Sequence, residues 1–217
     1  MDREPAFVAL STPLPRPVRG AGTRVQCGAH ELVLEGMRGG LSLLWTDGRE
    51  ARRFALGVAP GNDLALALRA PRLPVHVAAR ETIALGPHGR LRGYVQIPLV
   101  PTVMLMSSAA SEPQVLLELP TRGLAPEWDD RSGTVYRAVS PLHVRFPVPA
   151  SEPRAIVPLW IANPTASVAC PGQLPIDLVD AELRVLRGSV VAGPRRLRWS
   201  GDALASFLVE RRPGALR

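Results

Sequence analysis

Residues 90–106 read RLRGYVQIPLVPTVMLM, in which an alternating half is followed by an apolar half. Positions 91, 93, 95 and 97 are apolar or glycine, whereas positions 90, 92, 94 and 96 carry arginine, tyrosine or glutamine. This period of two predicts a strand with one buried and one solvent-facing side. Pro98 and Pro101 then remove two backbone donors, so we expect the chain to leave the sheet or to run along a sheet edge there.

Turn signals recur about every ten residues along the rest of the chain. The 23 prolines and 19 glycines are spread without a period, and Asp47-Gly48 is a strong signal for a tight hairpin. Many short strands joined by turns predict an all-β fold, an antiparallel β-sandwich. The 217 residues suffice for one such domain, and a two-lobed sandwich is the alternative.

Strand candidates are the alternating or β-branched runs between these turns. They are residues 23–27, 31–37, 41–46, 49–56, 64–68, 74–78, 82–85, 90–97, 114–119, 134–140, 143–148, 154–162, 167–170, 174–179, 182–191 and 195–199. The run at 154–162 is apolar on both faces and is expected to lie deep unless Pro158 marks a bulge. Residues 120–132 are expected to be an irregular surface loop. Residues 203–210 fit either a short C-terminal helix capped by Asp202 or a last strand.

The domain organisation predicted from these patterns is simple. Residues 1–22 are expected to be an extended, proline-rich lead-in, because the prolines near its end hinder strand pairing. Residues 23–217 are expected to form a single β-sandwich domain. Loops at 107–113 and 147–154 are the best positions for a boundary inside it.

The formal net charge is +7 and the sequence pI about 11.0, and all 26 basic residues are arginine. Arginine, alanine, glycine and proline have GC-rich codons, so a GC-rich genome explains this composition more simply than a nucleic-acid partner. The arginines are also scattered, with small groups at residues 52–53, 195–198 and 211–212. Because a phosphate-tracking groove usually has a dense patch with aromatic platforms, nucleic acid is a disfavoured partner.

Cysteine usage and hydropathy bear on the compartment. Cys27 and Cys170 are too few for a disulfide framework and are expected to be reduced and buried. The N-terminus has no signal-peptide pattern. The longest apolar stretch, residues 97–106, is far shorter than the roughly 20 residues of a spanning helix. We therefore expect a cytoplasmic location without a membrane span.

No motif in the sequence commits the chain to a chemistry. The four histidines are far apart, and the sequence has neither a nucleophile elbow nor a Gly-rich phosphate loop. The acidic cluster Glu127, Asp129 and Asp130 fits an ordinary turn better than acid–base or calcium chemistry. We therefore predict no catalytic residue, no cofactor and no metal site, and we do not expect an enzyme.

The solvent-facing side of residues 90–97 is a candidate binding surface. It carries Arg90, Arg92 and Tyr94, and such residue types are enriched at interface hot spots, although a merely solvated face fits the same pattern. Arg196 and Arg198 lie beside Trp199 in the sequence, where an arginine stacked on the indole needs no ligand.

Several short motifs follow one another in a characteristic order. They are Asp47-Gly48 with Arg52-Arg53, Pro60, Leu73-Pro74-Val75, Ile97-Pro98, Gly133-Thr134-Val135-Tyr136 and Ile161-Ala162-Asn163. In this order the chain resembles an uncharacterised family of archaea and bacteria, domain of unknown function 432, from about residue 23 to residue 199. The resemblance implies a β-rich fold and supplies no catalytic residues.

The favoured hypothesis is a non-catalytic protein-interaction or accessory module. Proline-flanked edges such as residues 12–17 and 97–101 can add to a neighbour's sheet, so the partner is another protein or a second copy of the chain. An alternative is a small-ligand-binding protein or hydrolase that uses Glu127, Asp129 and His143 near the 120–132 loop. A third hypothesis is anion or nucleic-acid binding through the arginines, which predicts a steep salt dependence.

Overall fold

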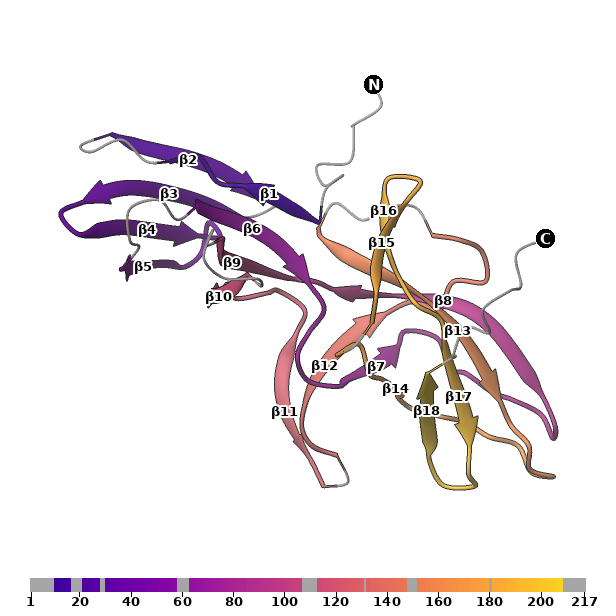
Figure 1. Ribbon diagram of the computed structural model, residues 1–217. Coiled ribbons are helices and arrows are strands. Elements are labelled where there is room, and N and C mark those ends of the chain that lie inside the picture. Colours follow the sequence, from indigo (N-terminus) through magenta and orange to yellow (C-terminus); the bar gives the residue numbers. More distant parts are fainter. Residues whose placement is uncertain are drawn as a thin grey trace. The chain divides into compact units, whose positions relative to one another are not determined.

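The computed structural model describes residues 10–16, 21–27, 30–57, 63–106, 113–130, 132–147, 152–179 and 181–208. Within these ranges every regular element is a β-strand, as Figure 1 shows, so the all-β prediction is confirmed. The strands are β1 (Ser11–Pro13), β2 (Gly22–Cys27), β3 (His30–Met37), β4 (Gly40–Thr46), β5 (Ala51–Leu56), β6 (Asp63–Arg69), β7 (Val75–Ala79), β8 (Arg90–Pro98), β9 (Val100–Met106), β10 (Gln114–Glu118), β11 (Ala125–Asp129), β12 (Gly133–Ser140), β13 (Arg154–Ala162), β14 (Leu174–Ile176), β15 (Leu183–Leu186), β16 (Ser189–Ala192), β17 (Arg195–Trp199) and β18 (Leu204–Leu208).

The chain divides into two compact units. The first contains β1 to β6, β9 and β10, and the second contains β7, β8 and β11 to β18. Among the described residues, the chain passes from one unit to the other at Arg69, Leu99, Pro120 and Pro153. Residues 107–112 and 148–151, where the sequence suggested boundaries, lie outside the described residues.

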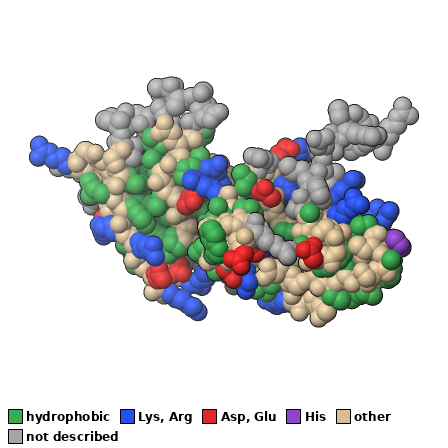
Figure 2. All heavy atoms as spheres, turned by 90° about the horizontal axis from the view of Figure 1, so that it is seen from below, with side chains coloured by type: hydrophobic (Ala, Val, Ile, Leu, Met, Phe, Trp, Pro, Cys, Tyr) green, Lys and Arg blue, Asp and Glu red, His purple; other side chains and the backbone are tan. Residues whose placement is uncertain are grey.

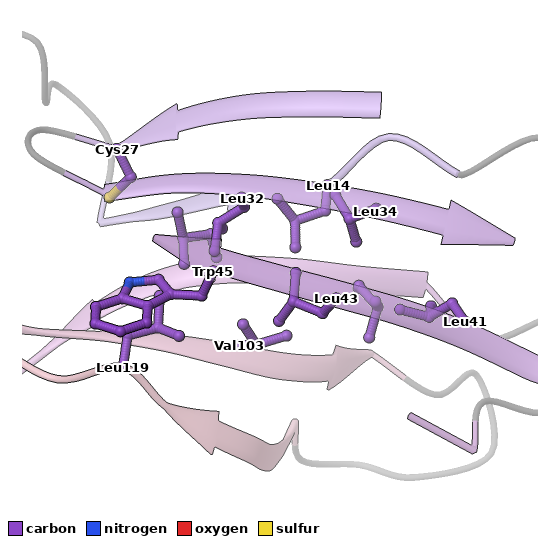
Figure 3. Close-up of a cluster of buried hydrophobic side chains, with 11 residues drawn as sticks. Leu14, Cys27, Leu32, Leu34, Leu41, Leu43, Trp45, Val103 and Leu119 are labelled. Carbon is purple, nitrogen blue, oxygen red and sulfur yellow. The ribbon is translucent and has the colours of Figure 1, made fainter. Parts of the chain in front are cut away.

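The first unit is a β-sandwich of two antiparallel sheets, in the strand orders β2-β3-β4-β5 and β1-β6-β9-β10. Trp45 Nε1 donates to His30 Nδ1 at 3.0 Å, which satisfies the only polar group of a side chain that is 1% exposed. Figure 3 shows the buried apolar side chains of both sheets gathered in one core, which confirms the predicted β-sandwich. That core contains Leu14, Cys27, Leu32, Leu34, Leu41, Leu43, Trp45, Leu64, Leu66, Val103 and Leu119.

The β4–β5 hairpin forms where Asp47-Gly48 predicts it. The Asp47 carboxylate accepts hydrogen bonds from the amides of Arg49 at 2.9 Å and Glu50 at 2.8 Å. Gly48 has a φ of 81°, a conformation that costs a side chain but not glycine. The aspartate and glycine therefore close the turn by separate mechanisms.

Pro13 lies in a paired strand, although the proline-rich piece was expected to resist pairing. The Leu14 amide donates to Leu64 O and the Leu68 amide donates to Leu10 O, both at 2.8 Å. The backbone N–H and C=O groups of residues 10 and 14 therefore point toward β6. The nitrogen of Pro13, which carries no hydrogen, points the other way, toward the unpaired edge of the sheet. Because β1 is an edge strand, the proline breaks no ladder bond.

The prediction from Pro98 and Pro101 holds in part. The chain does leave one sheet at Pro98, where β8 ends, and it enters another with β9. Pro101 is not on an edge, however, because β9 has β6 on one side and β10 on the other. The Pro101 carbonyl accepts a hydrogen bond from the Leu119 amide at 2.8 Å, and Leu119 lies just beyond the end of β10. The Pro101 nitrogen points to the same side, where the β9–β10 ladder has ended, so its lack of a hydrogen breaks no ladder bond.

The second unit is organised around β13. β8 pairs antiparallel with it over the whole length, from Arg154 opposite Pro98 to Ala162 opposite Arg90. On the other edge, β16 and then β17 pair with β13 in parallel, and they are extended by β15 and β18. The other sheet of this unit has the order β11-β12-β7-β14, with β7 and β12 parallel. The remaining strand pairs among the described residues are antiparallel, as expected.

Pro158 lies in the middle of β13 without a bulge, because the pairing with β8 stays in step through it. Tyr94, its partner on β8, exchanges backbone hydrogen bonds with His143 instead, at 2.8 and 2.9 Å. The backbone nitrogen of Pro158 therefore points away from β8. On that side of β13, β16 pairs with residues 155–156 and β17 with residues 159–162, so neither strand needs a donor from Pro158. This change of neighbour lets a proline occupy a central strand, which lies deep as predicted.

The expected loop at residues 120–132 is wrong, since Ala125–Asp129 form β11, paired with β12. Pro126 is compatible with a strand here because β11 is an edge strand. The C-terminal helix alternative is also wrong, and the last-strand alternative is confirmed by β18, which pairs antiparallel with β17. Asp202, the expected helix cap, instead lies in the β17–β18 turn, next to Gly201 with a φ of 111°.

Four further strand predictions need correction. Residues 82–85 and 167–170 contribute only the bridge between Leu85 and Ala169. Residues 143–147 of the expected strand 143–148 contribute only the bridge of His143 to Tyr94, and Val148 lies outside the described residues. Residues 182–191 hold a hairpin, β15 and β16, whose turn residues Arg187 and Gly188 both have positive φ.

The two cysteines differ in environment. Cys27 is buried in the core of the first unit, and this burial raises the pKa of its thiol from its ordinary value to about 11. Cys170 is exposed, so the expectation that both are buried is wrong. Its apolar neighbours in the sequence had suggested a strand, but only Ala169 is paired and buried there.

We expect thiol-specific reagents to distinguish the two cysteines. A maleimide at pH 7 should label Cys170 readily, whereas Cys27 should label at least about 100-fold more slowly, because both burial and the scarcity of thiolate protect it. Mass spectrometry of the native and urea-unfolded protein, with Cys170→Ser as the control, measures this. Rapid labelling of native Cys170→Ser protein would contradict the buried position of Cys27.

The raised pKa of the Cys27 thiol also contributes to the stability of the fold. This contribution is present below pH 9.0 and is lost as the pH rises toward 11.

Candidate anion-binding groove

Three adjacent strands of the second unit, β8, β13 and β17, bring four arginines together on one sheet face. The strand registers place Trp160 between Arg92 and Arg196, and they place Ala162 between Arg90 and Arg198. A hollow of about 750 Å³ lies at these two rows. We call it the arginine groove, and define it by Arg90, Arg92, Trp160, Ala162, Arg196 and Arg198.

The groove follows from simple alternation in the three strands. In β17 the side chains of Arg196 and Arg198 are exposed while Leu197 between them is buried. In β8 the same period exposes Arg90 and Arg92. β13 contributes a large aromatic and a small alanine to the same face, both half-buried. The alanine between two long arginines leaves the space that deepens the groove.

The groove is strongly cationic. Sheet geometry puts the two arginines of one strand about 7 Å apart and those of one row about 10 Å apart at their Cα atoms. No carboxylate among the described residues lies within ion-pair distance of any of the four. Several other arginines do have such partners, in the pairs Arg16–Asp63, Arg24–Glu31, Arg53–Glu35, Arg137–Glu127 and Arg184–Glu182.

Arg196 also has an aromatic partner. Its guanidinium lies over the Trp160 ring, 5.3 Å from the ring centroid. The sequence suggested stacking on the neighbouring Trp199, which is wrong, because successive residues of a strand point to opposite faces. The register with β13 decides which indole the arginine reaches.

Two buried polar side chains hold the backbone beneath and beside the groove. Arg195, 2% exposed, points to the other side of β17, and its Nε donates to Asp177 O at 2.6 Å. Asn163, 1% exposed, directly follows Ala162, and its Nδ2 donates to the carbonyls of Leu85, Gly86 and Ser167 at 3.2, 2.9 and 2.7 Å. These bonds fix the ends of the strands that carry the groove.

A smaller hollow of about 310 Å³ adjoins the groove and shares Arg198 with it. Its walls are otherwise formed by Pro164, Thr165, Trp199, Ser200 and Ala205. The cationic face therefore continues past Arg198 onto the small apolar groups of Ala205 and Pro164.

The sequence-predicted face Arg90, Arg92 and Tyr94 lies on one side of β8. Its two arginines line the groove. Tyr94 is two residues further along, in edge-to-face contact with Phe146 at 5.6 Å between ring centroids. Sequence reasoning missed that Arg196, Arg198 and Trp160 join this face, although the repeated Arg-x-Arg at 90–92 and 196–198 was the available signal.

The other predicted set, Glu127, Asp129 and His143, takes part in separate interactions. Glu127 forms an ion pair with Arg137, and the Asp129 carboxylate lies 3.8 Å from His76 Nδ1. Asp129 also accepts a hydrogen bond from the Ser132 amide at 2.7 Å. These two carboxylates thus interact with Arg137, His76 and Ser132.

His143 instead lies near Glu81. The Leu142 amide donates to the Glu81 carboxylate at 3.0 Å, and this bond lowers the pKa of Glu81, with a smaller contribution from the charge of His143. Among the described residues, none is hydrogen-bonded to the buried His143 Nε2. Across the described ranges, no three His, Cys, Asp or Glu side chains are grouped as a metal site requires.

Basic side chains on the face shown in Figure 2 are spread over the surface and form a denser group at the right of the view.

In the part of the chain that the structure describes, no helix has the length and apolarity needed to cross a membrane. Comparisons with protein families, with curated proteins and with solved structures found no match to this chain. The resemblance to domain of unknown function 432 thus stays a prediction from the sequence.

Proposed function

We propose that the protein is a non-catalytic binding module that holds an anionic partner in the arginine groove. The observation that carries this proposal is the set of four arginines around Trp160 and Ala162 without a carboxylate partner among the described residues. It unites the predicted Arg90, Arg92 and Tyr94 surface with the hypothesis of anion binding through arginine.

The physical case rests on charge and shape. Four like charges on one small face repel one another, and an anion seated between them removes that repulsion. A guanidinium presents planar, fork-like donors that match the oxygens of a phosphate or carboxylate. An anion over Ala162 is within the reach of Arg90 and Arg198 together, because both flank that residue in the sheet.

We expect inorganic tripolyphosphate to bind the groove with measurable affinity at low salt. The binding should shift the arginine Nε–H NMR signals of Arg90, Arg92, Arg196 and Arg198 more than those of other arginines. A variant with all four changed to glutamine should bind at least about tenfold more weakly, since charge-assisted contacts are lost.

The control variant changes four ion-paired arginines to glutamine, namely Arg16, Arg53, Arg137 and Arg184. It loses the same net charge, so it separates a local site from a general charge effect. We expect its affinity to change by less than about threefold. Equal weakening in the two variants would sink the proposal.

A further inference from the structure

We infer that the anionic partner is a single-stranded nucleic acid, with phosphates between the arginines and a base stacked at Trp160. This inference rests on the proposed function of the arginine groove and adds the class of ligand. The sequence disfavoured a nucleic-acid partner because its arginines are scattered along the chain. The fold changes this expectation, since it brings four of them together on one face.

The first argument is the combination of groups on one face. Single strands are held by a basic surface that follows the phosphates and by aromatic side chains on which bases stack. Trp160 is half-buried at the centre of the groove and has arginines on both sides. The guanidinium of Arg196, whose central carbon lies over the indole at 5.3 Å from the ring centroid, adds a planar cationic group that a base can stack on.

The second argument is the extent of the surface. The smaller hollow continues from Arg198 to Ala205, its pairing partner on β18, and to Pro164. Several successive nucleotides need both charged and apolar surface, and the two hollows together offer both. An acidic peptide also satisfies the arginines, but its carboxylates make no use of an indole face.

The third argument concerns the form of the nucleic acid. Bases in a duplex are stacked inside and show only their edges, and an α-helix or a β-ribbon reads those edges in a groove. The arginine groove is a hollow on the face of a sheet, which suits a base that is free to leave its stack. We therefore assign the site to a single strand.

The test compares four probes of matched length by fluorescence anisotropy with the full chain. They are a fluorescein-labelled dT12, a 12-unit abasic phosphodiester, a 12-residue polyglutamate and a dT12·dA12 duplex. We expect dT12 to bind at least about fivefold more tightly than each of the others, because at least one base stacks. Four neutralised phosphates predict a slope of log K against log salt of roughly −3.

Variants locate the stacking residue. Trp160→Leu should remove the advantage of dT12 over the abasic probe, and Trp160→Phe should restore most of it. Trp128→Leu is the matched control, since Trp128 is 71% exposed on β11 and lies outside the groove. Far-UV circular dichroism verifies that each variant is folded. If the Trp160→Leu variant does not fold, the Trp160→Phe variant still tests the proposal.

The outcomes separate the two proposals. If tripolyphosphate binds the groove but dT12 binds no better than the abasic probe, polyglutamate or the duplex, the ligand class is wrong and the anion site stands. If tripolyphosphate also fails to bind, both proposals are wrong. An advantage of dT12 that survives Trp160→Leu, or that disappears in Trp128→Leu, would overturn the assignment of stacking to Trp160.

Discussion

Arg195→Ala is expected to destabilise the protein by about 3–4 kcal/mol, the largest effect that we predict for a single arginine. The side chain is 2% exposed and donates to Asp177 O at 2.6 Å, with longer contacts to Gly193 O at 3.3 Å and Pro194 O at 3.4 Å. Its removal takes the guanidinium donor from these partly buried carbonyls and opens a cavity beneath β17. Urea unfolding followed by far-UV circular dichroism measures the change.

The neighbouring Arg196→Ala is the control for this prediction. Arg196 is exposed and lies over the Trp160 ring, so the loss should be about 1 kcal/mol or less. Arg195→Met keeps most of the buried volume but removes every donor, and it should recover only the packing part of the loss. Equal effects of Arg195→Ala and Arg196→Ala would contradict a structural role for the buried guanidinium.

Asn163→Ala is expected to cost about 2–4 kcal/mol. The two N–H groups of the amide serve the carbonyls of Leu85, Gly86 and Ser167, while its oxygen accepts from the Thr165 amide at 3.1 Å and hydroxyl at 2.7 Å. At 1% exposure, water does not replace these partners without opening the structure. Thermal and urea unfolding both report the loss.

Two other variants test the cause of that loss. Thr165→Val removes only one hydroxyl from the network, and we expect it to cost less than half as much as Asn163→Ala. Asn163→Asp keeps the acceptor for Thr165 but loses the donors, so it should be at least as damaging as alanine at neutral pH. An Asn163→Asp protein of wild-type stability would show that the donors contribute little.

Sequence reasoning failed in places where a strand's neighbours decide its structure. Residues 125–129 contain proline and charged residues, and only the position of β11 at a sheet edge makes them a strand. Residues 82–85 have the composition of a strand but contribute a single bridge, because Leu85 meets only Ala169. Local pattern does not report which backbone groups find a partner.

For the arginine groove too, the sequence predicted the residues that share a strand face but not which strands are neighbours. Alternation alone places Arg90, Arg92 and Tyr94 on one face of β8, and it also places Arg196 and Arg198 on one face of β17. Nothing in the two segments shows that one strand, β13, lies between them. The parallel pairing of β13 and β17 makes the groove, and parallel partners are joined by connections too long for a local turn signal.

The sequence by itself determined the all-β class, because its period-two runs and frequent turn residues suit strands and exclude long helices. It also determined which side chains share a strand face, since that depends only on the backbone pleat. The tertiary structure alone decided that Arg195 is buried while Arg196 meets Trp160, and that four arginines from two distant segments form one groove. Those contacts depend on strand order and register, which are set by the packing of residues far apart in the chain.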